Sequence, residues 1–104
     1  MHVSVTRVST GDHPIGTATI VAEEMARWLC DLDGYEGFLT LSREGTTLGL
    51  TFWSSAEAAE RQRALRMQFL ERMTAVAGVE VEEVVGYEVS FAQVPAALLG
   101  PMGE

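Results

Sequence analysis

The stretch LTFWSSAEAAERQRALRMQFLERM, residues 50–73, decides the fold of this 104-residue chain. It opens on alternating apolar residues that end at Trp53, a pattern typical of a β-strand. Ser54 and Glu57 then have the spacing of a capping box, which predicts that a helix starts there. The helical period continues up to Gly78, a residue typical of helix ends. The chain is therefore expected to pass from a strand directly into a long helix.

The segments that flank this stretch repeat the same two patterns. Alternation predicts strands over residues 2–8, 37–43 and 46–53, with the last two joined by a hairpin turn at Gly45. A period near 3.6 predicts a first helix over residues 18–32.

A last strand is predicted over residues 79–91. Its apolar side chains are expected to share one face that only Glu83 interrupts: Val79, Val81, Val85, Tyr87, Val89 and Phe91. Residues 92–104 form a tail, in which the PAALL segment is expected to make one helical turn.

The predicted order is β-α-β-β-α-β, a ferredoxin-like α+β domain over residues 1–91 with two helices on one face of an antiparallel sheet. The strand at 46–53 carries Leu48, Leu50 and Phe52 on one side, and its other side is also fairly apolar. A monomer would leave one such face in water. We therefore expect a homodimer in which two sheets meet as a dimeric α+β barrel.

Composition excludes several kinds of partner. The net charge of −8, with glutamates mixed among the arginines, argues against nucleic acid. No apolar stretch approaches the roughly 20 residues that cross a bilayer, so no membrane partner is expected. A single cysteine, Cys30, and no apparent signal peptide indicate a cytoplasmic protein. His2 and His13 have no spaced partners, so no metal site is predicted.

Two polar residues interrupt the apolar face of the second predicted helix. Gln62 and Arg66 lie four residues apart, among apolar positions that include Phe69. A buried amide or guanidinium without a partner is costly. Either a ligand or water satisfies these groups, or Arg66 extends to the rim and pairs with a carboxylate. Trp53 either walls the same cavity or belongs to the ordinary core.

Residues 34–60 combine three short motifs, in which Gly37-Phe38 begins a strand, Trp53-Ser54 ends the next, and Glu57-Ala58-Ala59 opens a helix. This combination resembles the antibiotic-biosynthesis monooxygenase family of dimeric α+β barrels. The resemblance implies that fold, and the activities it implies include cofactor-free oxygenation of phenolic polyketides and haem degradation.

Two departures from the family pattern bear on the activity. The chain has no asparagine, which family oxygenases and haem degraders commonly use, and no histidine in residues 54–77, which haem degraders need. The missing histidine argues against haem degradation. Among the activities that the resemblance implies, this favours a monooxygenase without a cofactor, acting on a small phenolic or polycyclic aromatic. The alternative is a non-catalytic dimer of the same fold that binds a small hydrophobic ligand or supports a partner enzyme.

In such an enzyme the substrate supplies the electrons as a phenolate or carbanion. Arg66 is expected to stabilise the anion, Gln62 to orient an oxygen atom, and His13 to act as the base. The residues expected to wall the substrate ring are Trp53, Tyr87 and Phe69.

Overall fold

A computed structural model of the chain describes residues 1–9, 11 and 15–99. In chain order its elements are β1 (His2–Ser9), α1 (Ile15–Leu29), β2 (Tyr35–Arg43), β3 (Thr46–Trp53), α2 (Ala56–Arg61), α3 (Arg63–Ala77), β4 (Glu80–Glu88) and the 3₁₀ turn η1 (Ala96–Leu99). The predicted order is confirmed, and the PAALL segment does form one turn. None of the described helices is long and apolar enough to cross a membrane.

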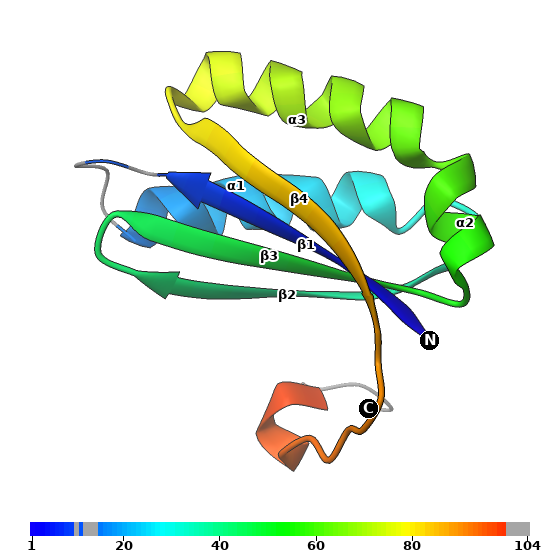
Figure 1. The fold of residues 1–104 in the computed structure, drawn as a ribbon. Coiled ribbons are helices and arrows are strands. Elements are labelled where there is room, and N and C mark those ends of the chain that lie inside the picture. The colour runs from blue at the N-terminus through cyan, green and yellow to red at the C-terminus, as the bar shows by residue number, and fades with distance from the viewer. Residues whose placement is uncertain (10, 12–14, 100–104) are drawn as a thin grey trace.

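The four strands form one antiparallel sheet in the order β2-β3-β1-β4, which is the ferredoxin-like arrangement. Figure 1 shows α1, α2 and α3 on one side of this sheet and the segment after β4, with η1, on the other. The hairpin turn lies where the sequence predicts it, with Gly45 at a φ of 81°. We call the two sides of the sheet the covered face and the open face.

Trp53 identifies the covered face. Its side chain is fully buried and packs with Met25 and Leu29 of α1, Ala59 of α2 and Leu70 of α3. Because side chains along a strand alternate between faces, every second residue of β3 counted from Trp53 also lies beneath the helices.

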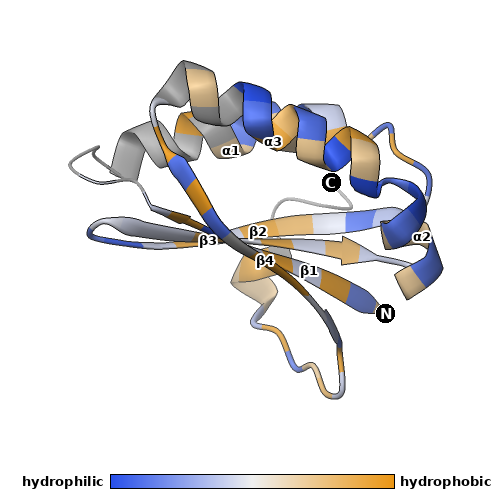
Figure 2. Cartoon of the chain, turned by 45° about the horizontal axis from the view of Figure 1, so that its top comes forward, coloured by the Kyte–Doolittle hydropathy of each residue, from blue (hydrophilic) through white to orange (hydrophobic). Residues whose placement is uncertain are grey.

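The open face carries the other half of the alternation and is strongly apolar. At its centre Leu50 of β3 lies between Val5 of β1 and Leu39 of β2. Figure 2 shows hydrophobic residues recurring along β1, β3 and β4. By register the same face also carries Val3, Leu41, Leu48, Phe52, Val85 and Tyr87. A contiguous apolar surface of this kind usually marks an interaction site.

The prediction that the last strand presents one continuous apolar face is wrong. Arg7 pairs with Glu83 but Val8 pairs with Val81, so β4 contains one extra residue at this point. Such a bulge reverses the side on which the preceding side chains lie. Val81 accordingly packs against the core of the covered face, whereas Tyr87 lies on the open face.

The long second helix is divided, and it starts one residue later than predicted. Ser55 is the N-cap, since its Oγ accepts the backbone N–H of Ala58 at 3.1 Å. The N–H of Ser54 instead donates to the carbonyl of Gly34 at 2.8 Å, which holds Ser54 outside the helix. At Gln62 the backbone leaves the helical region (φ −95°, ψ 1°), so α2 and α3 run in different directions (Figure 1).

The change of cap can be tested directly. Ser55→Ala is expected to lower the free energy of unfolding by about 1 kcal/mol, because the N–H of Ala58 loses its acceptor. Ser54→Ala is the matched control and should change it by only about 0.5 kcal/mol or less. Urea denaturation measures both variants, and a larger loss for Ser54→Ala would restore the capping box that the sequence suggested.

Candidate functional site

A pocket of about 310 Å³ lies on the covered face, between α2–α3 and the β1–β4 edge of the sheet. We call it the α2–α3 pocket. Its lining combines apolar side chains with charged ones, and its volume lies at the lower end of the range for small-molecule sites. The lining residues are His2, Ser4, Ala56, Ala59, Glu60, Arg63, Arg66, Met67, Val84 and Gly86. The pocket lies between the second predicted helix and the sheet, but Arg66 is the one residue of its described lining that the sequence analysis assigned to the site.

Arg66 is the most deeply buried charged residue of this pocket, with 6% of its surface exposed. Its Nη2 donates to the carbonyl of Ala59 at 2.9 Å, and its guanidinium carbon lies 5.1 Å from the centroid of the Trp53 ring. Arg66 forms no ion pair with any carboxylate of the described residues, and its Nε has no hydrogen-bond partner among them. The described residues therefore do not support the alternative in which Arg66 pairs with a carboxylate.

Burial lowers the pKa of Arg66, and the positive charge of Arg63 lowers it further, while Glu60 acts in the opposite direction. Arginine nevertheless stays protonated in proteins, so the pocket holds a cation with unused donor capacity. A buried cation of this kind is stabilised by an anionic partner with oxygen acceptors.

The break at Gln62 helps to position this cation. In an unbroken helix the Ala59 carbonyl would accept the backbone N–H of residue 63. Here that carbonyl accepts a hydrogen bond from the side chain of Arg66. The guanidinium is therefore held over Trp53 by a bond to the backbone of the preceding helix.

Trp53 lies behind Arg66 and is not itself part of the pocket lining. Its indole Nε1 has no hydrogen-bond partner within the described part of the chain. Tyr35 meets the Trp53 ring edge-on, with centroids 6.3 Å apart and an interplanar angle of 81°. Burial raises the pKa of Tyr35, and nearby Cys30 adds to the rise, so the phenol stays protonated at neutral pH. Tyr35 can therefore donate a hydrogen bond but is a poor base.

The other residues predicted for the site do not join Arg66. Gln62 makes a long contact of 3.5 Å from Nε2 to a backbone carbonyl of the α1–β2 turn. Phe69 stacks on Trp28 in the core, with ring centroids 4.5 Å apart. Tyr87 is 54% exposed on the open face, so the sheet separates it from Arg66. His13 lies outside the described residues.

The sequence analysis did not identify one lining residue, His2, whose side chain can take part in acid–base chemistry. His2 shares the covered face because it pairs with Trp53 in the sheet, and its Nδ1 lies 2.9 Å from Oε2 of Glu88. No local motif indicates its role, which depends on the antiparallel pairing of β1 with β4 that brings His2 beside Glu88. Within the described ranges no three His, Cys, Asp or Glu side chains gather as a metal site would require, so His2 has a carboxylate partner and no ligand set.

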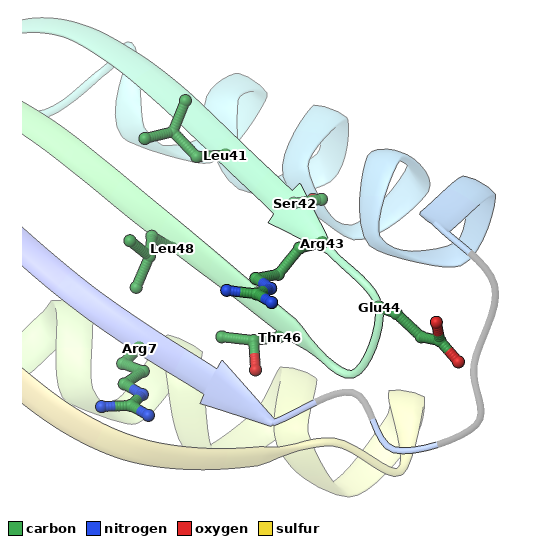
Figure 3. A pocket seen from close by; sticks show the side chains of 7 residues that line it. All are labelled: Arg7, Leu41, Ser42, Arg43, Glu44, Thr46 and Leu48. Carbon is green, nitrogen blue, oxygen red and sulfur yellow. The ribbon is translucent and has the colours of Figure 1, made fainter.

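A second pocket, of about 570 Å³, lies on the open face near the β2–β3 hairpin (Figure 3). Arg7 and Arg43 border the apolar side chains of Leu41 and Leu48 there. Every charged side chain that lines this second pocket is exposed to solvent, and Arg7 pairs with Glu82 at 3.4 Å. Exposed pairs of this kind contribute little energy. The α2–α3 pocket, with its buried cation, is the stronger candidate.

Several solved structures have the same architecture. A Deinococcus radiodurans protein assigned to the antibiotic-biosynthesis monooxygenases matches with a TM-score of 0.65 at 19% identity, over 91% of this chain and 98% of that one. SnoaB, a cofactor-independent oxygenase from Streptomyces nogalater, gives 0.67 at 16%, over 88% and 94%. The ActVA-Orf6 monooxygenase of Streptomyces coelicolor, solved with nanaomycin D, gives 0.62 at 14%, over 91% and 92%.

No family model matches the chain, and no curated protein matches its sequence. The three structural likenesses nevertheless cover nearly the whole of both partners in each comparison. The chain therefore has the ferredoxin-like fold of the antibiotic-biosynthesis monooxygenases.

Proposed function

We propose that the chain is a cofactor-independent monooxygenase whose substrate, a small phenolic or polycyclic aromatic, binds as an anion in the α2–α3 pocket. The observation that carries this proposal is Arg66, a buried cation without a carboxylate partner among the described residues. A phenolate oxygen pairs with the positive charge of the guanidinium that lines the pocket, while Met67 and Val84 offer apolar contact to the ring. SnoaB, a cofactor-independent oxygenase, has the same fold.

Anthrone serves as a model substrate for the chemistry. A base removes a proton from the methylene carbon opposite the carbonyl, which gives an anion with its charge on oxygen. The anion passes one electron to O₂, and the two radicals join to form a carbon–oxygen bond. The resulting peroxide takes up a proton, and loss of water with the second methylene hydrogen leaves a carbonyl. One anthrone and one O₂ thus give one anthraquinone and one water, and the substrate supplies all the electrons.

The pocket contributes chiefly to the first step. Arg66 stabilises the negative charge that develops on the substrate oxygen, and burial strengthens this interaction by excluding water. Arg63 adds a second positive charge to the lining. Trp53 keeps the guanidinium in place through its ring face.

Oxygen uptake tests the proposal. Purified protein is mixed with anthrone or with a panel of naphthols in an oxygen electrode, and quinone formation is followed by absorbance. We expect uptake of one O₂ per quinone formed, at a rate above that of buffer alone. A rise in melting temperature with these compounds but no oxygen uptake would instead support the non-catalytic binding protein.

We also propose that the chain works as a cytoplasmic homodimer joined through its open faces. The open face presents apolar side chains around Leu50, and the segment after β4 adds the exposed side chains of Phe91 and Leu98. A second copy with the same surface buries both. The exposed free thiol of Cys30 suits a reducing compartment.

Light scattering after gel filtration tests the assembly. Leu50→Glu is expected to convert the dimer to a folded monomer, because it places a charge at the centre of the proposed interface. Leu65→Glu is the control, since Leu65 is 48% exposed on α3 and away from the open face. A wild-type monomer, or a dimer that Leu50→Glu leaves intact, would contradict the proposed interface.

A further inference from the structure

We infer that His2, oriented by Glu88, is the base that removes the substrate proton in the α2–α3 pocket. The inference rests on the proposed function and names a base that the structure describes, whereas the sequence suggested His13. Three observations support it. Glu88 is bonded to one ring nitrogen of His2, the ring fits closely over Gly86, and His2 lines the same pocket as Arg66.

The carboxylate of Glu88 fixes the orientation of the ring. Oε2 of Glu88 lies 2.9 Å from Nδ1 of His2, so in the neutral ring Nδ1–H donates to it. Nε2 then carries the free lone pair, which is the form that a general base requires. When Nε2 takes a proton, the negative charge of Glu88 stabilises the imidazolium, as a carboxylate does in other histidine-based sites.

The imidazole ring of His2 lies close to the neighbouring strand at Gly86 and also lines the pocket. A Cβ at residue 86 would lie 2.7 Å from Nε2 and 2.9 Å from Cε1 of His2, so the ring fits closely over β4 only because this residue is glycine. The His2 side chain is 16% exposed, whereas Glu88 is 66% exposed. The ring is therefore largely enclosed, and its carboxylate partner approaches from the solvent side.

The charged groups around the pocket favour transfer of a substrate proton to one side of the pocket and binding of the resulting anion at the other. The charged groups near it are Arg63 and Arg66 of α3, Glu60 of α2, Glu88 of β4 and the amino group of Met1, which lies 4.0 Å from Glu88. His2 and Arg66 line the same pocket from opposite layers, the sheet and the helix. A substrate between them loses its proton to His2 and places its negative oxygen against Arg66.

The proton step can be measured without oxygen. In D₂O under nitrogen, proton NMR follows exchange of the methylene hydrogens of anthrone for deuterium. Wild-type protein is expected to accelerate this exchange above buffer, and His2→Ala to reduce the saturated rate by at least about tenfold with little change in KM. Added imidazole should restore part of the lost rate. His2→Gln, which can still donate to Glu88 but cannot take the proton, should behave like His2→Ala.

Glu88 acts through His2 and is a positioning residue. Glu88→Gln is expected to lower the exchange rate severalfold through kcat rather than KM, because the imidazolium loses its negative partner. Glu80→Gln is the matched control, since it removes the same charge from an exposed position on the same strand. If Glu88 and His2 formed only a structural surface pair, neither Glu88→Gln nor the His2 variants would lower the exchange rate, and added imidazole would have no effect.

The outcomes separate this inference from the proposed function. Exchange that depends on His2 but occurs without oxygen uptake in air supports the base and overturns the oxygenase. Oxygen uptake with exchange at wild-type rate in both His2 variants overturns the base and leaves the oxygenase standing. Wild-type protein that accelerates neither reaction overturns both. Melting temperatures confirm that each variant is folded before its rate is compared.

Discussion

Replacing Arg66 with methionine is expected to lower kcat for oxygen uptake with anthrone by about 10²–10³-fold, the loss typical of removing a group that stabilises a developing anion. The same variant should be within about 1 kcal/mol of wild type in stability. Methionine fills a similar volume, and the loss of the bond to Ala59 is offset by removing a buried guanidinium whose Nε has no partner in the described ranges. An oxygen electrode and urea denaturation measure the two effects.

Arg72→Met is the control for this experiment. It removes the same charge from the same helix, but Arg72 is exposed and does not line the pocket. Its turnover should stay within about twofold of wild type, because exposed charges at a distance are screened. Unchanged turnover in Arg66→Met would remove Arg66 from the site. A stability loss of several kcal/mol would show instead that the guanidinium has a structural role.

Replacing Trp53 with alanine is expected to lower the free energy of unfolding by about 3–5 kcal/mol, as for other large aromatic side chains removed from a core. Trp53 is fully buried and contacts residues from all three α-helices, so the cavity cannot be filled by movement of one element. Domains of this size have a total stability of roughly 5–15 kcal/mol, so the variant would be close to unfolding at physiological temperature.

Trp53→Phe separates packing from the support of Arg66. It keeps an aromatic face beneath the guanidinium and leaves a smaller cavity, so a loss of about 1–2 kcal/mol is expected. Urea denaturation measures both Trp53 variants. A loss below about 1 kcal/mol for Trp53→Ala would mean that the core does not depend on this residue as its burial indicates.

The strands could be predicted because their signal is local. Leu48, Leu50 and Phe52 alternate with polar or small residues, and Gly45 marks the turn, so β3 has the predicted bounds. The break at Gln62 had no such signal, because glutamine is a good helix former and the apolar period runs through it. Tertiary contacts accompany the break, since Arg61 reaches the carboxylate of Asp33 at 3.4 Å.

The site could be predicted only in part, because some of its features depend on tertiary contacts that have no local sequence signal. Arg66 was identifiable because a charged residue on an apolar helix face is visible in the periodicity. Tyr87 was assigned to the wrong side of the sheet. The bulge in β4 separates it from the face of Val81, and no glycine or proline at the bulge indicates this in the sequence. His2 was missed because its role depends on pairing with Glu88, which is 86 residues away in the chain.

The central claim is that the α2–α3 pocket binds an aromatic anion against Arg66, and the absorption spectrum of an anaerobic complex tests it most directly. Anthrone is titrated into wild-type protein and Arg66→Met under nitrogen, at a pH where free anthrone is neutral. We expect the absorption band of the anion to appear with wild type and to be absent with Arg66→Met. A neutral spectrum in wild type, or the same anion band in both proteins, would contradict the claim.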